Sequence, residues 1–266
     1  MKYLEKVYII ENEEALQGLE ERLFDISNFH YAIEYSRGRI LFKSYDRGID
    51  TILKDLGYAP VEENEVDPNE WAKNILDKPF ELVEGVIVDP TGKAEDIEEG
   101  KILIKIPLGM AFGTGLHQTT KIAAYLLTKV LKKGDGVLDI GTGTAILAIL
   151  AKRLGAGYVL AVDNDPIAID VARENVNLNG VSVDLKISNL VSDVEGKFDV
   201  IVVNIVAAVL EKLAESIFKV LKQDSTLILS GIDFEHESVL DRYKERGFKV
   251  VETRRGEEWL GAILKL

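Results

Sequence analysis

The stretch VLDIGTGTAILAI, residues 137–149, joins a short apolar strand to a helix through two closely spaced glycines. A strand that ends in a glycine turn and continues as a helix is a building unit of parallel α/β sheets. Open sheets of this kind bind ligands at such turns, and the missing Cβ atoms of Gly141 and Gly143 let a ligand approach the backbone. The stretch therefore predicts an α/β domain with a ligand site where the strand ends.

The sequence around this turn alternates between strand-like and helix-like segments. Strands are expected over residues 136–141, 158–163, 183–188, 198–206 and 225–231, and helices over residues 119–131, 146–155, 166–180, 207–221 and 239–246. Apolar strands between helices are typical of a parallel sheet covered on both faces. Two last strands, 248–255 and 258–266, meet at Arg255-Gly256, which predicts an antiparallel hairpin. We expect a Rossmann-like, seven-stranded sheet that ends in this hairpin.

The first part of the chain has a different order of elements. Residues 1–66 read as strand, helix, strand, strand, helix, strand, which predicts a small ferredoxin-like α+β domain. Residues 67–80 follow as a linker helix, with Asp67 as its N-cap and Pro68 in its first turn. Residues 81–266 form the large domain, which begins with two strand-like stretches at 81–89 and 101–107.

Composition excludes several classes of protein. Of the 266 residues, 47% are hydrophobic, which is enough for a buried core and excludes disorder as the main state. No apolar run approaches the ~18–20 residues of a membrane span. The chain has no Cys, hence no disulfide or thiolate metal site, and no metal-ligand spacing elsewhere. We expect a cytoplasmic monomer without a metal or a membrane partner.

The acidic charge is concentrated in the first two-fifths of the chain. The net charge is -13, and residues 1–107 hold 24 Asp and Glu against 13 Lys and Arg, whereas residues 108–266 hold 21 against 19. Nucleic-acid binding needs basic surfaces, so no direct nucleic-acid partner is expected. An acidic region would suit a basic partner. The alternative interpretation is that the acidic charge only keeps the protein soluble.

Two polar residues follow other predicted strands. Asp163 lies 22 residues beyond Gly141, where an acidic side chain can accept hydrogen bonds from both ribose hydroxyls. Asn204 ends the apolar run of FDVIVVNIV, and its carboxamide can orient an amine or a cofactor without adding charge. The alternative for Asn204 is a loop residue that satisfies local backbone. These residues predict a nucleoside site and leave the choice between NAD and S-adenosylmethionine open.

A glycine-rich loop, IPLGMAFGTGLHQTT at residues 106–120, precedes the first helix of the large domain. Its three Gly in seven residues suit a loop that covers a ligand, with Phe112 as a wall of the site and Thr120 in contact with the cofactor. His117 is either a base or an ordinary polar contact. Elsewhere, a dinucleotide fingerprint that starts at Gly141 needs a small residue at position 146, and Ile146 disfavours it.

These motifs together resemble a known family. MAFGTGLHQTT, VLDIGTGTAILAI, AVDNDP, ENVNLNG, DVIVVNIV, LSGI and EWLGAIL are similar to the methyltransferase family that modifies large-subunit ribosomal protein eleven, from about Trp71 to the carboxyl end. Where that family commonly has Ser-Gly after the turn, this chain has Thr144-Ala145, and Leu108 replaces a common Pro.

The resemblance implies a function. It implies the class I methyltransferase fold, a substrate-recognition role for residues 1–66, and methylation of lysine side chains and of a terminal α-amine. It also implies S-adenosyl-L-methionine as cofactor, bound by Thr120, Gly141, Asp163 and Asn204. The alternatives are an NAD-linked oxidoreductase, a non-catalytic ribosome-associated binding module, and a methyltransferase for RNA or a small molecule.

Overall fold

The chain forms two compact units in this computed structural model, Met1–Ile75 and Leu76–Leu266. The structure describes residues 3–12, 15–16, 18–19, 31–36, 39–44, 47–66, 78–94, 97–107, 113–256 and 258–266. Most of the expected linker helix over residues 67–80 lies outside the described residues, as do Phe112 and Leu108. The domain boundaries expected from the sequence therefore stay predictions.

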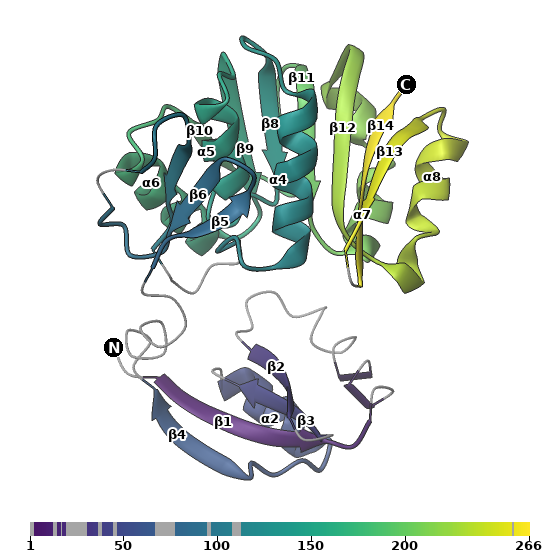
Figure 1. The fold of residues 1–266 in the computed structure, drawn as a ribbon. Coiled ribbons are helices and arrows are strands. Elements are labelled where there is room, and N and C mark those ends of the chain that lie inside the picture. Colours follow the sequence, from purple (N-terminus) through teal and green to yellow (C-terminus); the bar gives the residue numbers. More distant parts are fainter. Residues whose placement is uncertain are drawn as a thin grey trace. The chain divides into compact units, whose positions relative to one another are not determined.

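The smaller unit contains a four-stranded antiparallel sheet in the order β2-β3-β1-β4 (Figure 1). Its elements are β1 (Tyr3–Ile10), β2 (Tyr31–Ser36), β3 (Arg39–Ser44), α2 (Arg47–Asp55) and β4 (Glu62–Val66). Alternate residues of β3, Ile40 and Phe42, are buried with Ile49 and Leu53, which lie one helical turn apart on α2. The strand order and the antiparallel pairing are those of a ferredoxin-like sheet, as the order of elements predicted.

The larger unit contains a seven-stranded sheet in the order β10-β9-β8-β11-β12-β14-β13 (Figure 1). Its strands are β8 (Gly136–Ile140), β9 (Tyr158–Asp163), β10 (Asp184–Ile187), β11 (Phe198–Asn204), β12 (Leu221–Asp233), β13 (Lys249–Arg255) and β14 (Trp259–Lys265). The strands from β10 to β12 pair in parallel, and β14 runs antiparallel to both of its neighbours. The predicted sheet with its terminal hairpin is confirmed.

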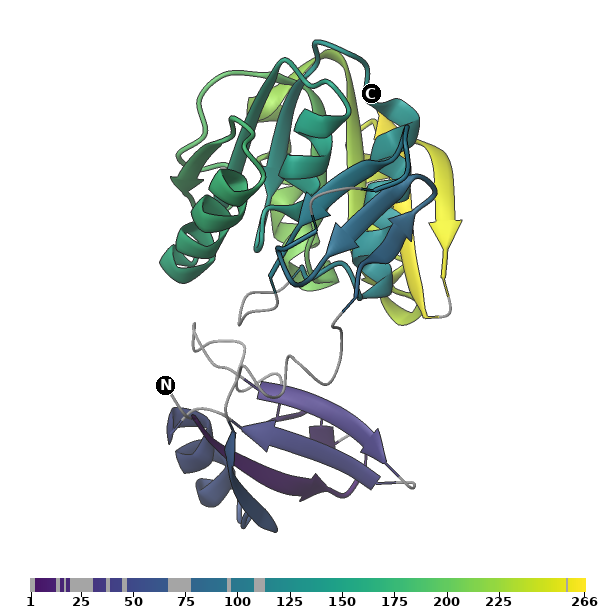
Figure 2. The same ribbon diagram turned by 60° about the vertical axis from the view of Figure 1, so that its left-hand side comes forward.

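Helices cover both faces of this sheet (Figures 1 and 2). One face packs against α4 (Gln118–Val130), α5 (Ile146–Arg153) and α6 (Pro166–Leu178); the other against α7 (Ala207–Leu213), α8 (Val239–Glu245) and the 3-10 helix Ile217–Val220. Successive strand residues serve opposite faces: Val137 belongs to the first core and Leu138 to the second. Among the described residues, no helix is long and apolar enough to cross a membrane.

Three predicted elements were wrong in extent. The strand expected over residues 225–231 is longer, since β12 spans Leu221–Asp233. The stretch 81–89 forms two strands, β5 (Phe80–Val83) and β6 (Val86–Asp89), because the chain reverses at Gly85, whose φ is +76°. With β7 (Ile102–Lys105) they make a separate three-stranded sheet. The expected helix 207–221 ends at Leu213, because the chain must return to the sheet in time for Leu221 to pair with Phe198.

Candidate active site

The glycine turn lies at the point where the strand order of the large sheet reverses, between β8 and β11. The N–H groups of Gly141 and Thr142 both donate to the carbonyl oxygen of Val162, at 2.9 and 3.0 Å, which bends the end of β8 over β9. Gly141 has a φ of +72°, and a Cβ there would lie 2.4 Å from Cγ2 of Ile205. Both the backbone conformation and the close approach therefore require glycine.

The carboxylate of Asp163 is fixed beside this turn by two backbone groups. Its Oδ2 accepts from the N–H of Gly143 at 3.0 Å, and its Oδ1 accepts from the N–H of Asp165 at 3.1 Å. A carboxylate has about four acceptor sites, so capacity for two further donors remains. The structure thus brings Asp163, Gly141 and Gly143 together, as the sequence predicted for a nucleoside site.

Asn204 and Thr120 also meet, although 84 residues separate them in the chain. Nδ2 of Asn204 donates to Oγ1 of Thr120 at 3.4 Å, and Thr120 is fully buried in the first turn of α4. This turn is tied to the sheet by Ser230, which pairs with Asn204 in the register and donates from Oγ to the carbonyl oxygen of Thr119 at 2.9 Å. Oδ1 of Asn204 is buried and has no hydrogen-bond partner in the described part of the chain.

A second buried acceptor lies on the neighbouring strand. Asp139 in β8 is almost completely buried; its Oδ2 accepts from Oγ1 of Thr142 at 2.7 Å, and its Oδ1 has no partner among the described residues. Burial, with a smaller contribution from the charge of Asp163, raises the pKa of Asp139 to about 7. The sequence places Asp139 at the start of a D-x-G-x-G spacing, which is typical of S-adenosylmethionine binders, but assigns its carboxylate no role of its own. The signal for that role was a carboxylate inside an apolar run.

Ile205 is held between two glycines and thereby fixes the peptide that carries Asn204. On one side its Cγ2 fills the space where Gly141 lacks a Cβ. On the other side, a Cβ on Gly231, whose φ is +86°, would lie 2.2 Å from the carbonyl oxygen of Ile205. No sequence signal marked Ile205, because an isoleucine at a strand end is an ordinary core residue.

The two residues that replace the family's common Ser-Gly, Thr144 and Ala145, have different consequences. Oγ1 of Thr144 donates to the carbonyl oxygen of Gly113 at 2.6 Å, which anchors the glycine-rich loop to the turn. The carbonyl of Thr144 accepts from Nδ2 of Asn175 at 2.9 Å. Ala145 has a φ of +64°, a left-handed conformation that costs a residue with a Cβ about 1–2 kcal/mol. The Thr144 hydroxyl therefore supports the glycine-rich loop, whereas Ala145 adds strain to the turn before α5.

His117 is an N-cap rather than a base. Its Nδ1 accepts from the N–H of Thr119 at 3.3 Å, and its ring packs edge-on against Trp259 with centroids 5.0 Å apart. Partial burial of the ring lowers the pKa of His117, which favours the neutral imidazole. Because its Nδ1 lone pair is engaged by the helix, the interpretation as an ordinary polar contact is favoured.

The strand order, the terminal hairpin and the glycine turn at the reversal point define a class I methyltransferase, an enzyme that uses S-adenosyl-L-methionine. A sequence model of the family described as ribosomal protein L11 methyltransferase (PrmA) matches residues 13–266. The chain belongs to this family. The resemblance, the fold class, the enzyme class and the cofactor expected from the sequence are thereby confirmed, and the oxidoreductase alternative is set aside.

Individual members of the family match this chain over nearly the whole of their own length. A "Ribosomal protein L11 methyltransferase" from Thermosipho melanesiensis is 44% identical over 266 residues, which cover 99% of this chain and 98% of the relative. One from Thermotoga maritima is 42% identical over 270 residues, covering 100% and 99%. A crystal structure described as ribosomal protein L11 methylase from Lactobacillus delbrueckii subsp. bulgaricus superposes with a TM-score of 0.66 at 33% identity, covering 70% of this chain and 97% of that one.

Proposed function

We propose that this chain transfers methyl groups from S-adenosyl-L-methionine to amino groups of ribosomal protein L11, namely lysine side chains and the terminal α-amine. One observation supports this most directly: on the adjacent strands β8 and β11, Oδ1 of Asp139 and Oδ1 of Asn204 are buried acceptors with no hydrogen-bond partner among the described residues. An unsatisfied buried acceptor costs about 1–3 kcal/mol, so a site that contains two of them suits ligands rich in N–H groups.

The residues at the turn fit the cofactor. Gly141 and Gly143 shape the turn against which it would lie, Asp163 would accept from its ribose hydroxyls, and Asp139 and Thr120 would bind its amino-acid end. When bound, the cofactor supplies a methyl group already activated by a sulfonium. Phe112, expected as a wall of the site, stays a prediction.

The protein's own task is to present an uncharged amine. At pH 7, a lysine with the reference pKa of ~10.4 costs about 4.6 kcal/mol to deprotonate, whereas an α-amine costs about 1 kcal/mol. Oδ1 of Asn204 can accept an N–H of the neutral amine and so direct its lone pair. A carboxylate at this position would instead favour the charged ammonium. With Nδ1 of His117 engaged in the cap, we infer that solvent takes the proton before transfer.

Transfer of a labelled methyl group tests the proposal. Purified protein, labelled S-adenosyl-L-methionine and ribosomal protein L11 should give a labelled L11 band, with the label on amino nitrogens after hydrolysis. Total ribosomal RNA is the control acceptor and should stay unlabelled. No label in L11 would favour the non-catalytic binding module, and label in the RNA would favour the RNA methyltransferase.

The cofactor affinity should depend on pH through Asp139. Since the pKa of Asp139 is raised to about 7, the carboxyl is mostly protonated below neutrality, and binding of a cationic group must displace that proton. Affinity should therefore rise with pH, by about 20-fold from pH 5.5 to 7.5, and level off above. Calorimetry at several pH values measures this, and Asp139→Asn should bind weakly at every pH. The same pH slope in Asp139→Asn would contradict the assignment.

We also propose that the acidic amino-terminal region docks the basic substrate protein. Exposed Glu62, Glu63 and Glu65 on β4 are carboxylates that a Lys-rich protein could meet. Reversing all three to Lys should raise KM for L11 about tenfold and flatten its salt dependence, with the cofactor Kd unchanged. A matched control reverses exposed acids of the larger unit: Glu174, Glu195 and Glu211. Equal effects of both triple variants would contradict docking and leave net charge as the cause.

A ribosomal-protein substrate also supports the cytoplasmic location expected from the sequence. The monomer stays a prediction.

A further inference from the structure

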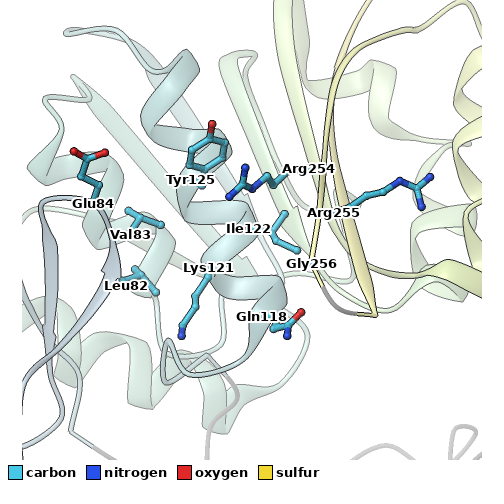
Figure 3. A pocket seen from close by; sticks show the side chains of 10 residues that line it. All are labelled: Leu82, Val83, Glu84, Gln118, Lys121, Ile122, Tyr125, Arg254, Arg255 and Gly256. Carbon is cyan, nitrogen blue, oxygen red and sulfur yellow. The ribbon is translucent and has the colours of Figure 1, made fainter.

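A hollow of about 560 Å³ lies on the outer side of α4, between the turns of the β5–β6 and β13–β14 hairpins (Figure 3). Its lining residues are Leu82, Val83, Glu84, Gln118, Lys121, Ile122, Tyr125, Arg254, Arg255 and Gly256. This volume lies within the ~300–1,000 Å³ of typical ligand sites. The hollow is separate from the cofactor turn, because none of Gly141, Asp163 and Asn204 lines it.

The lining combines an apolar floor with two cations that have no carboxylate partner among the described residues. Leu82 and Ile122 are buried at its base. The guanidinium of Arg254 lies 4.6 Å from the centroid of the Tyr125 ring, and no ion pair engages it or Lys121 within the described part of the chain. Aromatic contact orients a guanidinium without neutralising it. Both cations therefore remain available to an anionic group.

The other charges at the hollow do not cancel these two. Arg255 is held by both carboxylate oxygens of Glu237 at 2.6 Å and points away from Tyr125 in Figure 3. Glu84, on the β5–β6 turn, is the single acidic residue of the lining within the part of the chain that the structure describes. The hollow is therefore basic on a chain whose net charge is -13. Its chemical complement is a carboxylate next to an apolar side chain.

The hollow and the methyl-transfer site share the first turn of α4. Thr120 is buried and bonded to Asn204, and the next residue, Lys121, lines the hollow. Consecutive helix residues point about 100° apart, so a bound segment would pass around this turn from an amine at Asn204 to a side chain in the hollow. This adjacency favours a segment of the substrate over an unrelated ligand.

We propose that the hollow docks a segment of the methyl-accepting protein, with an acidic side chain at Lys121 and Arg254 and an apolar side chain on Leu82 and Ile122. This inference rests on the proposed function. It assigns the larger unit a role in recognition, in addition to that of the acidic amino-terminal region.

The test is the double charge reversal Lys121→Glu with Arg254→Glu. Its matched control is Lys249→Glu with Lys265→Glu, a cross-strand pair of exposed lysines on β13 and β14. Lys249 lies five residues from Arg254 on the same strand, roughly 17 Å away. The first double variant should raise both the calorimetric Kd and the KM for L11 about tenfold. Its kcat at saturation and its cofactor Kd should stay within twofold of wild type. The control pair should match wild type in the Kd for L11, the KM for L11, kcat and the cofactor Kd.

The two readouts separate the two hypotheses. Methyl transfer by the wild type tests the proposed function, and direct binding of L11 tests the hollow. If the wild type binds L11 without methylating it, the proposed function fails while a weakened double variant still supports docking. Equal L11 binding by the wild type and the double variant overturns the docking proposal, as does an equal loss in the control pair.

Discussion

Gly141→Ala should weaken S-adenosyl-L-methionine binding by at least about 30-fold and lower the free energy of unfolding by about 2–4 kcal/mol. The added Cβ would lie 2.4 Å from Cγ2 of Ile205, at a φ of +72° that already disfavours any side chain. The carbonyl oxygen of Ile205 lies close to Gly231, which holds the Ile205 backbone in place. Relief of the contact therefore requires rotation of the Ile205 side chain or movement of the turn, and a moved turn shifts the cofactor cradle with it. Calorimetry and thermal unfolding measure the two effects.

Gly180→Ala is the control that separates strain from steric contact. Gly180 has a comparable φ of +61°, and a Cβ there would meet nothing within 4 Å. This variant should lose about 1–2 kcal/mol of stability through the left-handed backbone alone and bind the cofactor as wild type does. Wild-type cofactor affinity in Gly141→Ala would mean that the turn is structural and that the cofactor lies elsewhere.

The parts of the site that the sequence predicted are those set by local pattern and strand direction. A glycine turn after an apolar strand, and a polar residue at the end of a later strand, can be recognised without knowing the neighbours of either. Parallel strands then bring their carboxyl ends to one edge, which is why Asp163 and Asn204 both lie near Gly141. Thr120 was expected at the cofactor from its place after the glycine-rich loop and from the family resemblance, but no local pattern links it to Asn204.

The parts that could not be predicted depend on packing between distant segments. The unpaired oxygen of Asp139 exists only because β8 is central and both faces are covered. Ile205 matters because Gly141 and Gly231, 90 positions apart in the chain, close around it. The early end of α7 at Leu213 likewise follows from the pairing of Leu221 with Phe198, which outweighs a continuous helical pattern. Local propensity is a weak guide wherever such tertiary contacts compete with it.

Asn204→Ala should lower kcat for L11 about 100-fold, because a misplaced amine loses the alignment that in-line transfer needs. The cofactor Kd should rise only severalfold, since Gly141, Asp163 and Asp139 remain. Steady-state kinetics with L11 and calorimetry with the cofactor measure the two quantities separately. Asn177→Ala, at an exposed asparagine in the last turn of α6, is the control and should match wild type.

Stability distinguishes loss of function from loss of fold in this variant. Oδ1 of Asn204 is a buried acceptor without a partner in the described chain, so its removal relieves a desolvation cost of about 1–3 kcal/mol. What is lost is the single 3.4 Å hydrogen bond to Thr120. Asn204→Ala should therefore unfold at the wild-type temperature or above it. A variant that is at least as stable and about 100-fold slower would show that the protein tolerates an unpaired oxygen there because an amine uses it. Wild-type turnover would instead mean that Asn204 does not orient the amine and is only a loop residue.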